Sequence, residues 1–219
     1  LESSLQLTWQ DRPWQPQTDS FAFKTPGAAQ NVGWLCNTQV QFCARAFPAV
    51  PVEHTDAPAL MLLGGFLRNW FLHNAIREKG GAYGGGAGYD GNACAFRFYS
   101  YRDPRLTDTL KDFDASIDWL LNEPHEQRQL EETLLGIISD MDKPLSPSGE
   151  ARQAYHNALY GRTHEQRKRL RERLLEVSLS DLLRVGETWL TKGNACTAVV
   201  APNAKLAEVE ALGLTIEKL

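Results

Sequence analysis

The sequence has few cysteines, no long hydrophobic run and no strong excess of charge of either sign. Its four cysteines in 219 residues include no Cys-x-x-Cys pair, so we expect buried free thiols and a reducing compartment. No apolar run reaches the roughly 20 residues of a membrane-spanning helix. A formal net charge of −4 is not typical of a nucleic-acid-binding domain. We therefore expect neither a membrane nor a nucleic acid as partner.

Motifs for a metal or a nucleophile are also missing. Neither His-Glu-x-x-His nor the inverted His-x-x-Glu-His occurs, and there is no Gly-x-Ser-x-Gly. Glu53-His54 resembles the end of the inverted motif, but Val50 stands where its first histidine would be, and Pro51 would break the helix. The sequence therefore predicts no catalytic metal site in this chain.

The chain divides into an N-terminal arm or linker, residues 1–29, and one domain, residues 30–219. The arm is polar and contains three prolines, and the chain begins at Leu1, so we expect it to be part of a longer protein. Periodicity and capping signals predict the order strand, helix, strand, several helices and a final strand pair. This order predicts an α+β, two-layer domain with a mixed or antiparallel sheet and helices packed on one face. The expected strands are 32–47, 92–101, 195–201 and 214–216; the expected helices begin at Asp56, Asp103-Pro104, Pro124, Ser146-Pro147, Thr163, Ser178 and Asn203.

The most informative segment runs from Arg77 through a glycine-rich stretch that contains Tyr83. A phosphate-binding loop would follow a strand and precede a helix, which is the reverse of the order expected here, and no Gly-Lys-Ser/Thr occurs. A bulged strand without a function is a second interpretation. A third is a surface where glycines let a peptide approach and two side chains donate hydrogen bonds.

Each of these two side chains also has an ordinary explanation. Arg77 at a helix C-terminus interacts favourably with the helix dipole, and Tyr83 could be a surface tyrosine of a strand. The basic run 167–173 spreads its charges around a predicted helix, which favours a solvated face over an anion site.

The glycine-rich segment resembles a known family. The block Arg77-Glu-Lys-Gly-Gly-Ala-Tyr83-Gly, together with Tyr99-Ser-Tyr-Arg-Asp-Pro104, is similar to the last (fourth) domain of presequence proteases, a branch of the pitrilysin/insulinase class of zinc metallopeptidases. The similarity extends from about Val32 to the C-terminus. It implies the fold of the mitochondrial-processing-peptidase-like metallohydrolases.

The resemblance also implies functional residues. Arg77 would hold a main-chain carbonyl of a peptide substrate, and Tyr83 would donate to the scissile carbonyl as it becomes an oxyanion. Gly81, Gly84 and Gly85 would leave room for the peptide beside the strand.

The resemblance implies a division of labour within a longer enzyme that degrades short unstructured peptides. Zinc would be held by the N-terminal half of the same polypeptide, so this fragment alone is expected to be inactive. The implied location is intracellular, in a bacterial cytoplasm or a mitochondrial matrix. The alternative is a non-catalytic peptide-binding or assembly module of the same class.

Overall fold

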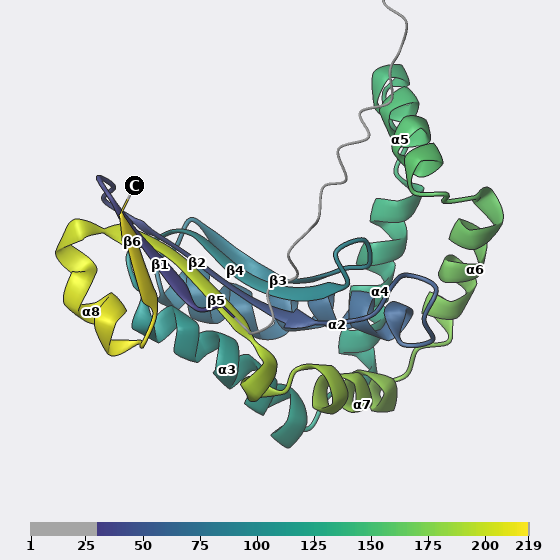
Figure 1. Ribbon diagram of the computed structural model, residues 1–219. Coiled ribbons are helices and arrows are strands. Elements are labelled where there is room, and N and C mark those ends of the chain that lie inside the picture. The colour runs from purple at the N-terminus through teal and green to yellow at the C-terminus, as the bar shows by residue number, and fades with distance from the viewer. Residues whose placement is uncertain (1–29, 219) are drawn as a thin grey trace, which may run out of the picture.

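The computed structural model describes residues 30–218, which form a six-stranded mixed sheet with helices on one face (Figure 1). This confirms the predicted α+β fold with helices on one side. The expected arm, residues 1–29, lies outside the described residues. The strands are β1 (Val32–Cys36), β2 (Gln41–Pro48), β3 (Gly84–Asp90), β4 (Ala95–Asp103), β5 (Cys196–Pro202) and β6 (Thr215–Lys218).

The strand order is β3-β4-β2-β5-β1-β6, so β3 and β6 are the two ends of the described sheet. The pairs β3–β4, β4–β2 and β2–β5 are antiparallel, whereas β1 runs parallel to both β5 and β6. The glycine-rich segment is thus an edge strand, which offers one side of its backbone to other peptides.

Most helices lie in the chain between β2 and β5, and several of them cover the sheet from below in the view of Figure 1; one short α-helix, Leu206–Ala211, follows β5. The helix α2 (Ala57–Leu67) continues directly into the π-helix η1 (Arg68–Lys79), which packs against β3. Figure 1 also shows α5 (Pro147–Leu159) projecting away from the sheet, and none of its residues is buried. The helices are α2 (Ala57–Leu67), η1 (Arg68–Lys79), α3 (Thr107–Asn122), α4 (Gln127–Asp142), α5 (Pro147–Leu159), α6 (His164–Leu175), α7 (Leu179–Trp189) and α8 (Leu206–Ala211), with short 3-10 helices η2 (Lys192–Asn194) and η3 (Asn203–Lys205).

The core lies between the sheet and the helices. Phe96 and Phe98 of β4 are fully buried on the helix-covered face, and the ring of Phe98 contacts that of Phe113 of α3. Tyr99 and Tyr101 of the same strand are exposed on the other face, as the alternation predicted. One face of the sheet is therefore not covered by any described helix, and we call it the open face.

Gly64 allows α2 to lie directly against β3, and the adjacent Gly65 allows it to lie close to α4. A Cβ atom on Gly64 would come within 2.7 Å of the Cα of Gly88, so a side chain there would separate the helix from the strand. The sequence predicted such a close approach at Gly64 and Gly65. At Gly65 the neighbour is Thr133 of α4, whose Cγ2 would be 3.0 Å from an added Cβ.

The single strand predicted over residues 32–47 was wrong. The chain forms β1 and β2, which run in opposite directions on the two sides of β5. Thr38 makes the turn between them: its backbone N–H donates to the Cys36 carbonyl, and its side chain bonds Val40. Alternation of apolar residues continues through the turn, so the pattern contained no sign of the reversal.

Two helix starts also differ from the prediction. Asp103 does not cap a helix at Pro104; it ends β4, accepts hydrogen bonds from the Arg105 N–H and the Thr109 hydroxyl, and α3 begins at Thr107. Likewise, α4 does not open at Pro124 but at a capping box formed by Glu126 and Gln129. The capping boxes predicted at Thr163 and Ser178 were confirmed.

The prediction of free thiols was confirmed, but the prediction that they are buried was confirmed for one cysteine only. All four thiols are free, but Cys43 alone is buried, while Cys36, Cys94 and Cys196 are partly exposed. Burial raises the pKa of Cys43 to about 12, so this thiol is inert at neutral pH.

Candidate functional site

The end of η1 is shaped by a turn that requires glycine. The N–H of Gly81 donates to the Arg77 carbonyl at 3.1 Å, and the N–H of Ala82 donates to the Ile76 carbonyl at 3.1 Å. Gly81 has φ of +78°, a left-handed conformation that residues with a Cβ rarely adopt. The turn therefore reverses the chain from the helix into β3 within a few residues.

Arg77 and Tyr83 stand at the two ends of this turn, and both are exposed. Tyr83 is 68% exposed, and its N–H donates to the Arg102 carbonyl at 3.3 Å, which joins it to the end of β4. Within the described part of the chain, neither side chain forms a hydrogen bond or an ion pair. Their donor groups are thus available to a ligand.

Tyr83 belongs to an aromatic cluster on the open face. Its ring meets the ring of Tyr101 edge-on at 5.6 Å, and Tyr101 meets Phe42 of β2 at 5.5 Å. The guanidinium of Arg102 lies 5.7 Å from the centre of the Tyr101 ring. Exposed tyrosine and arginine side chains of this kind are common where proteins bind peptides. We call Phe42, Tyr83, Tyr99 and Tyr101 the tyrosine surface.

The glycines expected to make room for a peptide differ in their surroundings. A Cβ on Gly84 would meet nothing within 4 Å, and Gly84 pairs with Tyr101, so open space lies beside the tyrosine surface. A Cβ on Gly85 would come within 2.7 Å of Ile76, so this glycine serves the packing of η1 on β3. The aliphatic part of Arg68 covers Gly86 and lies near the Tyr99 hydroxyl.

The sequence analysis singled out Arg77 and Tyr83 but missed Phe42, Tyr101 and Arg102 as their neighbours. The alternation of Tyr99 and Tyr101 with buried phenylalanines carried part of that signal. Nothing in the sequence near Phe42 indicated that it belongs to this cluster, because β2 reaches the cluster only through its pairing with β4.

Across residues 30–218, no three side chains of His, Cys, Asp or Glu gather in a group that could hold a metal ion. In the same part of the chain, no helix has the length and apolar character needed to cross a bilayer. The candidate site is therefore described by hydrogen-bond donors, aromatic rings and an edge strand.

Most of this domain matches the model of one protein family. The family model described as the PreP C-terminal domain matches residues 35–201, which include η1, the turn, β3 and β4.

Curated proteins with related sequences carry one name. A protein named "Presequence protease, mitochondrial" from Kluyveromyces lactis is 38% identical over 165 residues, which cover 75% of this chain and 16% of that protein. A protein with the same name from Xenopus laevis is 37% identical over 183 residues, 78% of this chain and 17% of that protein. The chain therefore spans about a sixth of the length of these relatives.

Solved structures share the fold at lower sequence identity. A protease from Helicobacter pylori superposes with a TM-score of 0.67 and 18% identity, covering 92% of this chain and 52% of that one. An M16 peptidase inactive domain from Pseudomonas fluorescens has a TM-score of 0.62 and 15% identity, covering 88% of this chain and 45% of its own. These likenesses show the fold.

Proposed function

The chain belongs to the family of PreP C-terminal domains, and from this premise we propose that it binds peptide substrate and stabilises the oxyanion in a zinc endopeptidase that degrades short unstructured peptides. The observation that carries the proposal is the position of two exposed donors, Arg77 and Tyr83, at one end of the edge strand β3. The tyrosine surface beside them supports it, because aromatic rings can pack on side chains of an extended peptide.

In this proposal Tyr83 donates its phenolic hydrogen to the carbonyl oxygen at the bond to be cleaved. That oxygen becomes negatively charged in the transition state, so the hydrogen bond strengthens as the reaction proceeds. Because no described group competes for the Tyr83 hydroxyl, it needs to break no internal bond before it donates. Arg77 donates to a neighbouring main-chain carbonyl and holds the peptide in place through the fixed fork of N–H donors on its guanidinium group.

The zinc of such an enzyme does not fit the residues that the structure describes. The described residues offer no group of three ligands, so we assign no step of the reaction through a metal to them. In the proposal, the metal belongs to the N-terminal half of the same polypeptide, which is the second partner of this domain. This chain alone is then inactive on peptides.

The location of the enzyme stays a prediction. The curated relatives are named as mitochondrial proteins. A mitochondrial matrix and a bacterial cytoplasm are both consistent with a peptide-degrading enzyme of this family.

The experiment that tests the proposal is Tyr83→Phe in the full-length polypeptide that contains this chain. We expect kcat for an unstructured peptide to fall about 10-fold or more, the usual scale for one lost oxyanion donor. Zinc content and the unfolding temperature should not change, since Tyr83 is exposed and makes no side-chain hydrogen bond in the described part. An unchanged kcat would remove the catalytic role.

A second candidate function is a non-catalytic peptide-binding or assembly module. One observation favours it: a structural neighbour is described as an M16 peptidase inactive domain. In that case Tyr83→Phe would weaken peptide binding or assembly but leave the turnover rate of bound peptide unchanged. The same variant therefore separates the two functions.

A further inference from the structure

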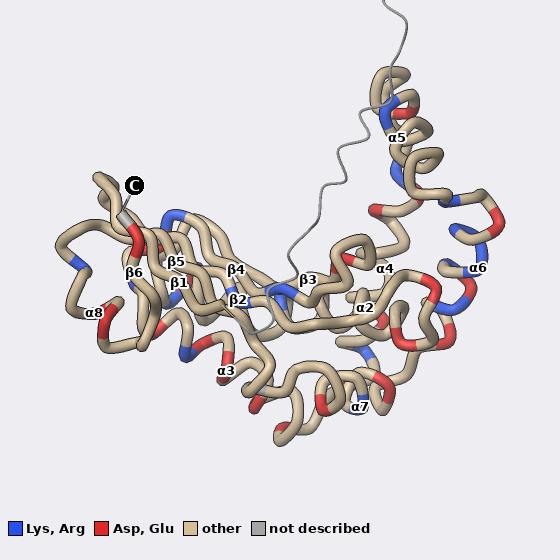
Figure 2. Tube along the Cα trace, in the orientation of Figure 1, with Lys and Arg blue, Asp and Glu red and all other residues tan. Residues whose placement is uncertain are grey.

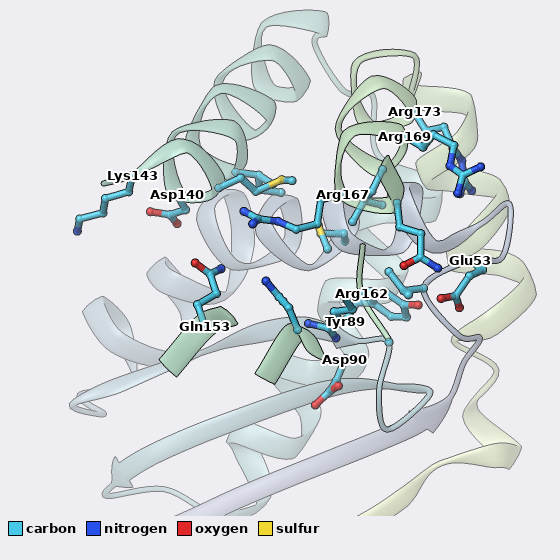
Figure 3. A pocket seen from close by; sticks show the side chains of 18 of the residues that line it. Glu53, Tyr89, Asp90, Asp140, Lys143, Gln153, Arg162, Arg167, Arg169 and Arg173 are labelled. Carbon is cyan, nitrogen blue, oxygen red and sulfur yellow. The ribbon is translucent and has the colours of Figure 1, made fainter. Parts of the chain in front are cut away.

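A pocket of about 890 Å³ includes the end of β3 at Tyr89 and Asp90 (Figure 3). Tyr83 precedes the other end of this strand. The loop before α2 contributes Glu53 to the pocket, and residues of α2, β4, α4, α5 and α6 supply most of the remaining walls. Arg162, in the turn between α5 and α6, closes one side by donating to the Asn92 side chain. The pocket is thus built from segments that lie far apart in the sequence.

The pocket has apolar as well as charged walls. Both methionines of the chain, Met61 and Met141, line it together with Ile137 and Leu170. Methionine side chains are flexible and adapt to ligands of different shape. The pocket can therefore accept a large apolar side chain without a single required shape.

Its charge is opposite to that of the whole chain. Six cationic and three anionic side chains line the pocket, although the formal net charge of the chain is −4. Three of the cations, Arg167, Arg169 and Arg173, come from the basic run of α6, whose concentration of charge is visible in Figure 2. The run is largely exposed, as the sequence predicted. The fold nevertheless brings three of its arginines to the wall of one pocket, and helical periodicity alone did not predict this.

Several of these cations are available to a ligand. Arg97 pairs with Asp90 at 3.2 Å, and Arg173 donates to the His54 carbonyl at 2.5 Å, so both are partly engaged. By contrast, the side chains of Arg167, Arg169 and Lys143 form no hydrogen bond or ion pair within the described residues. Guanidinium groups of this kind bind carboxylates with paired hydrogen bonds.

We propose that this pocket binds an acidic segment of a peptide substrate that also carries a large apolar side chain, at a distance from the bond cleaved near Tyr83. The inference rests on the proposed function. The course of β3 supports the inference, because this strand runs from Tyr83 to the pocket. In addition, Arg97 lines the pocket and faces the same side of the sheet as the tyrosine surface. Seven residues of strand span about 20 Å, so an extended peptide beside β3 reaches the pocket some six or seven residues from Tyr83.

The test uses the full-length polypeptide and two peptides that differ only in that distal segment. One peptide carries glutamates and a leucine there, and the other carries glutamines and the same leucine. The pocket variant is Arg167→Gln with Arg169→Gln. The matched control is Arg152→Gln with Lys168→Gln, which removes the same charge from α5 and α6 but at residues that do not line the pocket.

For the acidic peptide we expect the pocket variant to raise KM about 3- to 10-fold with little change in kcat, and the control to leave both unchanged. The glutamine peptide should respond to neither variant. A fluorescent copy of the acidic segment, too short to be cleaved, should lose affinity by the same factor, and raising the salt concentration should reduce the difference. Replacing its leucine by serine should weaken binding as well.

Equal effects of the pocket variant and the control, or equal losses for both peptides, would overturn the inference. So would a single-stranded oligonucleotide that displaces the labelled segment as well as the unlabelled peptide does, because the site would then recognise any polyanion. Tyr83→Phe separates this inference from the proposed function: it should lower kcat for both peptides and leave the affinity of the short segment unchanged.

Discussion

The indole N–H of Trp189 donates to the carboxylate of Asp56 at 2.9 Å, which joins the end of α7 to the start of α2 across 133 residues of chain. Arg184 of α7 pairs with the other carboxylate oxygen at 2.8 Å. Burial alone would raise the pKa of Asp56, but the hydrogen bonds from Trp189 and Arg184 outweigh it and hold this pKa below the ordinary 3.8. The charged carboxylate is therefore the form that the folded state stabilises.

The first prediction concerns acid stability. The pKa of Asp56 is lower in the folded than in the unfolded chain. Its contribution to the free energy of unfolding is therefore fully present above about pH 4–5 and is lost as pH falls through the folded-state pKa. Asp56→Asn should lower the free energy of unfolding by about 1–3 kcal/mol at pH 7 and by less at low pH. Urea unfolding at several pH values measures this. Asp142→Asn, at an exposed pair with Arg171, is the control and should have little effect at any pH. A loss for Asp56→Asn that is the same at pH 3 and pH 7 would contradict the prediction.

The second prediction concerns the contact of α2 with β3. Gly64→Ala should destabilise the domain by about 1–3 kcal/mol, because the new Cβ would lie 2.7 Å from backbone of β3, which cannot move aside easily. Gly136→Ala in α4 is the matched control: a Cβ there meets nothing within 4 Å, and alanine favours a helix by about 1 kcal/mol over glycine. Thermal unfolding measures both effects: the unfolding temperature should fall in Gly64→Ala and rise in Gly136→Ala. A stable Gly64→Ala would show that the two elements are not in contact.

The third prediction separates stability from peptide binding at two nearby glycines. Gly81→Ala should cost about 1–2 kcal/mol, because alanine must adopt a positive φ there. Gly84→Ala should leave the unfolding temperature nearly unchanged, since its Cβ enters open space, but it should raise KM for a peptide that lies beside β3. Unfolding curves and steady-state kinetics of the full-length enzyme measure both. An unchanged KM for Gly84→Ala would place the peptide elsewhere.

The fourth prediction concerns the thiols. Burial and the raised pKa of about 12 should protect Cys43 from maleimide in the native protein, while Cys36, Cys94 and Cys196 react. Mass spectrometry of peptides after brief labelling should show modification at those three positions, and full denaturation should add Cys43. Rapid native labelling of Cys43 would mean that β2 opens locally far more often than its burial suggests.

Much of the fold could be predicted from local patterns. The alternation in β4 correctly assigned Phe96 and Phe98 to the core and Tyr99 and Tyr101 to the other face. Capping boxes at Thr163 and Ser178 correctly located two helix starts, because they depend on side chains only three residues apart. Signals of this kind lie within one or two turns of the chain and need no knowledge of the rest of the molecule.

Other features could not be read from such patterns. The reversal between β1 and β2 depends on β5, which pairs with both strands and lies some 150 residues later. The start of α3 moved because the carboxylate of Asp103 bonds Arg105 and Thr109 instead of capping at Pro104. In both cases the local sequence is compatible with more than one backbone conformation, and tertiary contacts decide which one forms.

The sequence by itself determined the kind of surface at the end of η1: a glycine turn with a guanidinium on one side and a phenol on the other, in a block similar to one known family. Only the tertiary structure decided which groups surround it. Pairing of β2 with β4 brought Phe42 beside Tyr101, and the packing of α4, α5 and α6 near the end of β3 gathered separate arginines around one cavity. The physical reason is that turn conformation and helix capping are fixed by neighbouring residues, whereas clusters and pockets form from segments that meet only when the hydrophobic core has been buried.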